Sequence, residues 1–303
     1  MSCTRAFAVL AAALIGACGT PAPPTASSGA MPVAAQSAAP SPAPVASPAV
    51  ASGPRDFTVS GRQTQGGWVR GQAPAGTSSA RLGTTPLTLD PQGRFFAAFD
   101  RDAGHSQALV AELADGREVE KHLLVTPRDW RIEHVNVARR PGGASEAYLA
   151  RRAPELAAIA AARQVDTGAQ GWRQDFRWPA HGRISGRFGA QRVYRGEPGA
   201  YHSGLDIAGG AGAPYYAPAD GVVVLAAATP FSLEGYLLII DHGQGLNSAF
   251  LHSTRLLVRE GETVRQGQQL GTIGATGRAT GPHLHWSLVW RGQRLDPLLF
   301  LPE

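Results

Sequence analysis

Cysteine and charge are both scarce in this chain of 303 residues. Two cysteines are too few for a disulfide-dense scaffold, and a charged fraction of 17% excludes a charge-rich disordered chain. After the first 18 residues, no stretch reaches the roughly 20 consecutive apolar residues of a membrane-spanning helix. The net charge is +5, but the arginines are scattered rather than clustered. We therefore expect a solvated, mildly basic surface and no nucleic-acid partner.

Glycine and proline, in contrast, are abundant, with 37 and 23 residues, and many of the prolines lie near the N-terminus. Residues 19–54 consist almost wholly of Ala, Pro, Ser, Thr, Gly and Val. Such a composition cannot bury enough apolar surface to offset the entropy lost on ordering. Because prolines favour an extended, semi-stiff chain, we predict a disordered tether over residues 19–54 that carries no catalytic residue.

Residues 1–18 are typical of an export signal. Arg5 is followed by an apolar run of about half the length that spans a bilayer, and the segment ends in small residues. Its last four residues, Ile15-Gly16-Ala17-Cys18, resemble a bacterial lipobox, in which the cysteine is lipidated and begins the mature protein. This resemblance implies a periplasmic lipoprotein anchored through Cys18. Gly19 stands where inner-membrane retention usually needs an aspartate, which favours the outer membrane. The alternative is an ordinary signal peptide with an incidental cysteine.

The rest of the chain predicts a mainly β protein. Short strand signals separated by turn residues, such as Phe57–Val59 and Arg94–Phe99, recur over residues 55–135 and indicate a small antiparallel β-sandwich. His105 and His122 within it are predicted to lie on the surface. Residues 136–175 form a predicted helical connector, in which Pro154 splits the alanine-rich helix or starts a second one. We expect this connector to pack between the domains or to lie over a groove.

Stronger strand signals return over residues 176–303, which hold six of the nine histidines, and predict a C-terminal antiparallel β-sheet domain. His202 and Asp206 share one side of an extended segment, although such a pair is more often a surface feature. His283 and His285 project from one face of a strand. They form either an exposed polar face or a site in which they bind a metal, pair with a carboxylate or transfer protons. His252 closes an apolar strand and is uninformative alone.

Together these segments resemble the zinc endopeptidases of the lysostaphin/LytM type. The likeness runs from Trp178 to Pro297, nearly the whole C-terminal domain. Besides the histidine segments, it includes Gly182–Gly189, Ala217–Gly221, Gly261–Val264 and Thr276–His285. The loop Ala190–Tyr201, just before His202, is expected to form one wall of the substrate groove.

The resemblance implies a role for each of the five site residues. His202, Asp206 and His285 would bind Zn²⁺ and leave one coordination position for water or substrate. His252 and His283 would face the zinc-bound water and the developing oxyanion as general base and electrostatic stabiliser. Zinc can lower the pKa of bound water to about 7, which makes hydroxide available at neutral pH.

Two positions depart from the pattern of the family. The family usually has Phe-Glu after its His-x-His, where this chain has Trp286-Ser287, and Phe250 stands where a tyrosine is common. Neither change removes a ligand or a proton carrier, so they bear on substrate preference more than on activity.

These assignments predict a zinc metalloendopeptidase that hydrolyses peptide cross-links of cell-wall peptidoglycan through a zinc-activated water. The alternative is a non-catalytic LytM-type regulator of cell-wall amidases, with an amidase or a divisome protein as its partner, or a wall-binding module. Regulators of that kind typically lack zinc ligands, whereas this chain has all three. A further alternative is a latent enzyme, in which the connector helix or the sandwich covers the groove.

Overall fold

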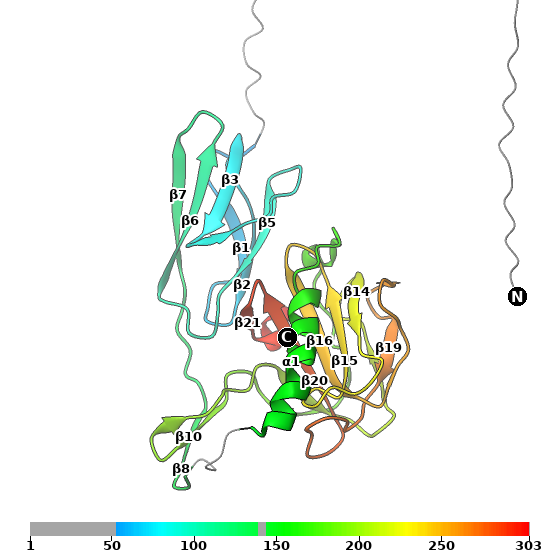
Figure 1. Ribbon diagram of the computed structural model, residues 1–303. Coiled ribbons are helices and arrows are strands. Elements are labelled where there is room, and N and C mark those ends of the chain that lie inside the picture. Colours follow the sequence, from blue (N-terminus) through cyan, green and yellow to red (C-terminus); the bar gives the residue numbers. More distant parts are fainter. Residues whose placement is uncertain (1–52, 139–143, 303) are drawn as a thin grey trace, which may run out of the picture. The chain divides into compact units, whose positions relative to one another are not determined.

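The computed structural model describes residues 53–138 and 144–302 (Figure 1). The predicted signal peptide with Cys18 and all but the last two residues of the predicted tether therefore lie outside the described residues. The described part is mostly β-strand with one α-helix, which confirms the predicted mainly β class. Within it, no helix is long and apolar enough to cross a membrane.

Two antiparallel sheets form the N-terminal region, as the alternating strand signals predict. One sheet has the order β1-β2-β5 and the other β4-β3-β6-β7. Their strands are β1 (Thr58–Arg62), β2 (Trp68–Gln72), β3 (Thr77–Leu82), β4 (Thr85–Pro86), β5 (Arg94–Ala98), β6 (Ser106–Leu113) and β7 (Glu118–Leu124). Val69, Phe95, Leu109 and Leu123 are buried between them, and burying such side chains is the main stabilising term of a small sandwich.

The next strand leaves this sandwich. β8 (Ile132–Val135) pairs in parallel with β10 (Gln191–Tyr194), which in turn pairs with β11 (Glu197–Pro198). The expectation of a loop over residues 190–201 is thus wrong in part, because β10 and β11 form a short hairpin there. β8 pairs with the backbone N–H and C=O groups on the outer edge of β10, although the two strands lie more than 50 residues apart in sequence.

A single helix, α1 (Glu146–Ala162), occupies the connector, and Pro154 lies inside it. The prediction that Pro154 divides the helix is therefore wrong. The helix is held on both sides of the proline, since Arg152 binds Glu234 and Glu155 accepts hydrogen bonds from Ser232. These contacts, together with apolar packing, offset the backbone hydrogen bond that proline removes. A short 3₁₀ turn, η1 (Gly171–Arg173), follows.

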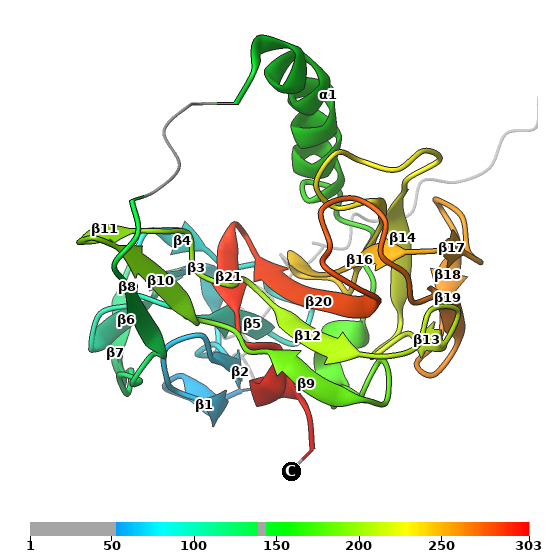
Figure 2. The same ribbon diagram turned by 90° about the horizontal axis from the view of Figure 1, so that it is seen from below.

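The C-terminal region is built on a large antiparallel sheet with the order β18-β14-β15-β16-β20-β12-β9 (Figure 2). Its strands are β9 (Arg183–Gly186), β12 (Leu205–Ala208), β14 (Gly221–Ala226), β15 (Tyr236–Asp241), β16 (Leu246–Ser253), β18 (Thr263–Val264) and β20 (His283–Trp290), and β21 (Gln293–Leu295) pairs with β20. A second sheet, β13-β19-β17, consists of β13 (Pro214–Tyr216), β17 (Arg255–Leu256) and β19 (Gln269–Thr272). The 3₁₀ turn η2 (Pro297–Phe300) ends the domain.

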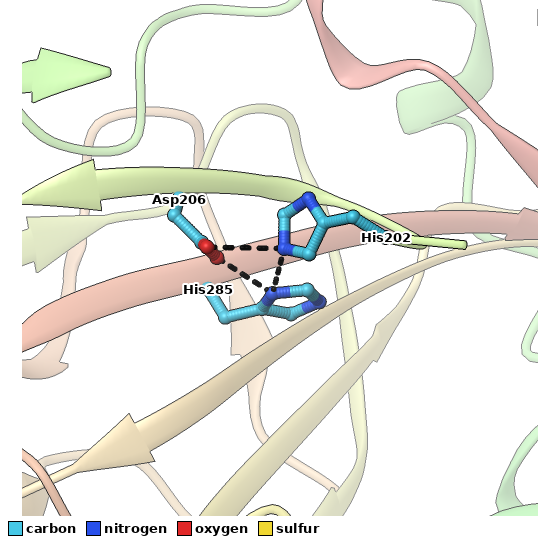
Figure 3. Close-up of side chains that lie close together, drawn as sticks. All are labelled: His202, Asp206 and His285. Carbon is cyan, nitrogen blue, oxygen red and sulfur yellow. Dashed lines mark hydrogen bonds and ion pairs between the residues drawn. The ribbon is translucent and has the colours of Figure 1, made fainter. Parts of the chain in front are cut away.

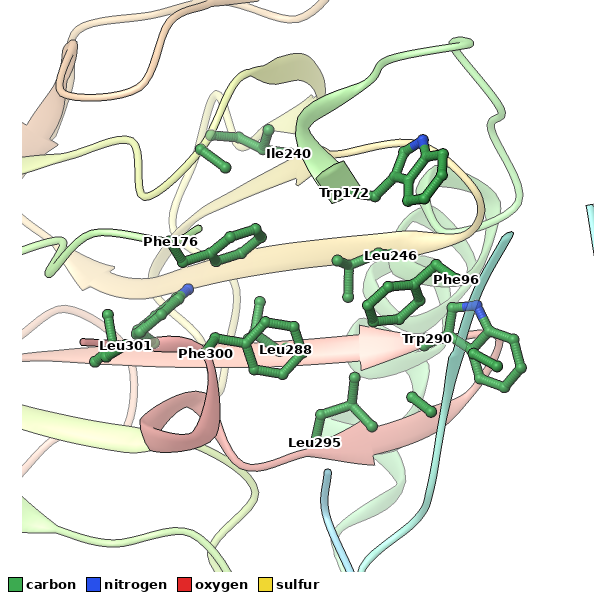
Figure 4. Close-up of a cluster of buried hydrophobic side chains, with 14 of the residues drawn as sticks. Phe96, Trp172, Phe176, Ile240, Leu246, Leu288, Trp290, Leu295, Phe300 and Leu301 are labelled. Atoms are coloured by element: carbon green, nitrogen blue, oxygen red, sulfur yellow. The ribbon is translucent and has the colours of Figure 1, made fainter. Parts of the chain in front are cut away.

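One hydrophobic core joins the sandwich to the large sheet (Figure 4). The ring of Phe96 in β5 lies 6.3 Å from that of Trp290 in β20 and 6.2 Å from that of Phe300 in η2. The indole N–H of Trp68 also donates to the carbonyl oxygen of Leu299 at 2.9 Å. On the opposite face of the sheet, α1 packs through Ala162 and its neighbours against β14, β15 and β16. The core thus covers one face of the large sheet, and α1 covers the other face over β14, β15 and β16.

Candidate metal centre and active site

Three potential metal ligands converge where β12 and β20 pair (Figure 3). The register sets Asp206 opposite His285, and His202 lies just before β12. Nε2 of His202 is 3.0 Å from Oδ2 of Asp206 and 3.2 Å from Nδ1 of His285, which lies 2.8 Å from Oδ1 of Asp206. Alternate side chains of a strand lie on the same face, so the residues of two separate sequence motifs form one cluster here.

The hydrogen bonds around this cluster decide which atoms can bind a metal. Nδ1 of His202 must donate to the carbonyl oxygen of Arg187, 3.1 Å away, because a carbonyl only accepts. Nε2 then faces Asp206 and His285. It donates to Asp206 when the ring is protonated and offers a lone pair to a metal when the ring is neutral. Tetrahedral zinc with ligand distances of about 2.0–2.1 Å separates its ligand atoms by about 3.3 Å, close to the spacings found here. The donor set therefore fits a three-ligand zinc site.

Two glycines make the convergence sterically feasible. A Cβ on Gly186 would lie 2.3 Å from Oδ2 of Asp206, and a Cβ on Gly204 would lie 2.7 Å from Nε2 of His285. Contacts this short force the neighbouring atoms to move. Both positions thus contribute to the site by lacking a side chain, a role that the sequence analysis missed although Gly204 lies inside the His202–Asp206 motif.

The electrostatics of the cluster keep Asp206 ionised. Burial alone would raise the pKa of Asp206, but hydrogen bonds with His202 and His285 lower it well below its ordinary value. Burial lowers the pKa of His285, which leaves that imidazole neutral and able to act as a ligand. Burial would lower the pKa of His202, but its hydrogen bond and charge interaction with Asp206 raise it. A divalent cation needs neutral imidazole ligands, so its binding would release a proton from His202.

The other two predicted residues, His252 and His283, lie beside the cluster with their rings 4.8 Å apart. Nδ1 of His252 donates to the carbonyl oxygen of Thr276, and Nδ1 of His283 donates to that of Gly281, each at 2.8 Å. Both histidines therefore keep Nε2 for other partners. Nε2 of His283 lies 3.8 Å from Oδ1 of Asp206, within reach of the metal-ligand cluster.

His252 also has an unusual backbone. Its φ of 64° lies in the left-handed region that few non-glycine residues adopt. Its N–H donates to the carbonyl oxygen of Glu234 at 2.8 Å, which helps to hold this conformation. Burial lowers the pKa of His252, so the ring is neutral at neutral pH and ready to accept a proton.

A groove runs past all five residues. It consists of two adjoining hollows, of about 1250 Å³ and about 480 Å³, that share His202 and Arg278. Residues 128–138 and 184–202 contribute most of the lining of the larger hollow. The smaller hollow contains the other four site residues. It is bounded on one side by a face of α1, formed by Arg152, Leu156 and Ile159, and by Arg163 just after the helix. The alternative that the connector lies over a groove thus describes its position better than packing between the domains.

Residues 200–297 match the model of Peptidase family M23. This segment is an M23 peptidase domain. ShyA of Vibrio cholerae, a peptidoglycan DD-endopeptidase, is 38% identical over 128 residues, which cover 41% of this chain and 28% of ShyA. A lipoprotein NlpD/LppB homolog of Pseudomonas aeruginosa is 40% identical over 128 residues, covering 42% of this chain and 39% of that protein.

The murein hydrolase activator NlpD of Escherichia coli is 38% identical over 130 residues, covering 42% of this chain and 31% of NlpD. The match therefore spans less than two fifths of each of these relatives. Among solved structures, a Pseudomonas aeruginosa protein assigned to peptidase M23 aligns with 79% of this chain and 95% of its own, at 29% identity and a TM-score of 0.60. That alignment reaches beyond the M23 domain into the preceding regions.

The positions where this M23 domain departs from the family pattern are buried. Trp286 is fully buried and its indole N–H donates to Oγ of Ser248 at 3.2 Å, whereas Ser287 faces the smaller hollow. Phe250 stacks on Tyr215 with ring centroids 5.4 Å apart. Of these residues, only Ser287 changes the surface that a substrate would meet.

Proposed function

We propose that this chain is a zinc-dependent endopeptidase that hydrolyses peptide cross-links of cell-wall peptidoglycan. The observation that carries the proposal is that three metal ligands and two further histidines lie together in one site. Three ligand atoms converge, and two further histidines beside them bind backbone carbonyls through Nδ1. Their Nε2 atoms form no hydrogen bond with any described residue. M23 peptidases are zinc metallopeptidases, and the relatives with a stated activity act on peptidoglycan or regulate its hydrolysis.

His202, Asp206 and His285 would hold the Zn²⁺, which supplies Lewis-acid polarisation of the scissile carbonyl and lowers the pKa of water to about 7. His252 accepts a proton at Nε2, because burial keeps its imidazole neutral and Thr276 fixes its Nδ1–H. His283, held by Gly281, presents Nε2 as a donor to developing negative charge on the carbonyl oxygen. The carbonyl partners hold both rings in one tautomer.

The experiment compares zinc content and muropeptide release for the full chain and two variants. Wild type is expected to bind one zinc per chain and to release muropeptides from purified sacculi. His202→Ala is expected to lose the zinc and the activity, because a ligand is gone. His283→Ala is expected to keep the zinc and lose most of the activity, since removing one donor to a developing oxyanion typically costs about 10²–10³-fold. Wild type that binds no zinc, or that binds zinc and releases nothing, would refute the proposal.

A second candidate, a non-catalytic activator of cell-wall amidases, is favoured by the NlpD relatives. Zinc-loaded wild type that releases no muropeptides alone but accelerates an amidase would support it. We propose further that the protein works in the cell envelope as a periplasmic lipoprotein anchored in the outer membrane through Cys18. Replacement of Cys18 by serine, followed by membrane fractionation, tests the anchor.

A further inference from the structure

The smaller hollow extends from the metal ligands along the face of β20. His283, His285, Ser287 and Val289 alternate along this strand and all line the hollow. Ala249 and Leu251 of β16 lie beside them, opposite Ser287 and His285 in the register. The floor beyond the histidines is therefore small and uncharged.

Two arginines lie on the walls of this hollow away from the histidine motifs. Arg163 follows the last residue of α1, and Arg294 of β21 pairs with Val289 of β20. At about 3.4 Å per residue, Val289 is about 14 Å along β20 from His285. An extended peptide covers that length in about four residues.

Neither guanidinium has an anionic partner among the described residues. Nε of Arg163 is buried without a hydrogen bond. Glu234 is the one carboxylate whose charge acts on Arg163, and both of its oxygens already accept hydrogen bonds from Arg152 at 2.6 Å. The side chain of Arg294 forms no ion pair, and its guanidinium lies 5.7 Å from the ring of Tyr201.

The two guanidinium groups also act on each other. Burial lowers the pKa of Arg163, and the positive charge of Arg294 lowers it further. Like charges facing one hollow repel, and an unsatisfied buried N–H costs free energy. A carboxylate between them would remove both penalties, since guanidinium groups bind carboxylates with paired, charge-assisted hydrogen bonds.

We propose that Arg163 and Arg294 form a carboxylate-binding subsite, which selects peptides that carry an acidic group about four residues from the bond at the metal centre. This subsite rests on the proposed peptidase function for its substrate, but its ligand chemistry comes from residues outside the M23 motifs. Arg163 caps the C-terminal end of α1, so this end of the helix is part of the proposed substrate-binding surface.

The test measures binding without hydrolysis. The full chain with the His283→Gln substitution and bound zinc is titrated calorimetrically with a cross-linked muropeptide dimer, and with the same dimer after its carboxylates are converted to amides. The acidic dimer is expected to bind at least tenfold more tightly than the amide. Adding Arg163→Gln or Arg294→Gln is expected to abolish most of that preference and to leave amide binding unchanged. Arg294 is exposed, so its variant keeps the test valid if Arg163→Gln is unstable.

Arg259→Gln is the matched control, because Arg259 is exposed and lines neither hollow. It is expected to keep the full preference for the acidic dimer. Equal affinity for the two dimers, no binding of either, or equal weakening of both by the arginine variants would overturn the subsite. A preference that persists when wild type releases no muropeptides would uphold the subsite while refuting the peptidase. Equal hydrolysis of both dimers by wild type would support the peptidase while refuting the subsite.

Discussion

Replacing Arg152 by methionine is expected to destabilise the protein strongly. Its guanidinium binds both oxygens of Glu234 at 2.6 Å and Oε2 of Glu155 at 2.9 Å. The three side chains are only 10–11% exposed. Methionine has a similar length but no charge, so the substitution removes the partner of two buried carboxylates and little of the packing.

The size of the effect follows from what is left behind. Removing one partner of a buried ion pair leaves an uncompensated charge, which costs about 3–5 kcal/mol. For a protein of this size, that corresponds to a fall in melting temperature of about 6–20 °C. The double variant Arg152→Met/Glu234→Gln is expected to recover part of the loss, because only Glu155 is then left without its cation.

The free energy of unfolding is measured by urea titration with tryptophan fluorescence as the signal. Arg151→Met is the matched control, since Arg151 is the exposed neighbour on the same helix and only its Nε donates, to Oγ of Ser232. That control is expected to cost no more than about 1 kcal/mol. A loss for Arg152→Met that is no larger than that of Arg151→Met would show that the pair behaves like an exposed salt bridge and would refute the reasoning.

Three further predictions concern the metal centre, pH and the shared core. Gly186→Ala is expected to weaken zinc binding by about 10–100-fold, because its Cβ would lie 2.3 Å from Oδ2 of Asp206; an unchanged zinc affinity in a competition titration contradicts this. Burial would raise the pKa of Glu155, but hydrogen bonds from Arg152 and from Ser232 lower it below the unfolded value of about 4.3. The stabilisation from its ionised form is therefore present above about pH 4.3 and is lost as the pH falls through the lower pKa of the folded state. The difference in unfolding free energy between wild type and Glu155→Gln should accordingly become smaller as the pH falls from about 6 to about 3. Phe96→Ala should cost about 3–5 kcal/mol in urea titration, since Phe96 is fully buried in the core that joins the sandwich to the large sheet; a loss under about 1 kcal/mol would argue against a shared core.

Much of the fold was predictable because its signals are local. Alternation of apolar and polar residues marks the sandwich strands and the strands of the large sheet, and the mainly β class follows from them. The parallel pairing of β8 with β10 was not predictable, since it joins segments more than 50 residues apart that have no strong strand pattern. The continuous helix through Pro154 likewise depends on Glu234, a tertiary partner that helix propensity does not include.

The site residues likewise divide into those that local sequence predicts and those that depend on tertiary structure. The pairs His202/Asp206 and His283/His285 were found because each pair lies within one short segment, and the register of β12 with β20 then sets them together. The residues around them were not found. Gly186 contributes only by its missing Cβ, and Arg163 enters the groove from a helix whose direction the sequence leaves open.

Two histidines with similar sequence surroundings show why histidine content alone does not define an active site. His242 and His252 both lie at the ends of apolar strands, β15 and β16, and both are buried. His242 uses both nitrogens, since Nδ1 donates to the carbonyl oxygen of Asp220 and Nε2 accepts from Oγ of Ser248, each at 2.7 Å. His252 uses only Nδ1 and keeps Nε2 for the groove. Proton transfer needs a nitrogen without a fixed partner. His252 therefore fits the proposed role of proton acceptor, whereas His242 contributes to the stability of the strands beside it.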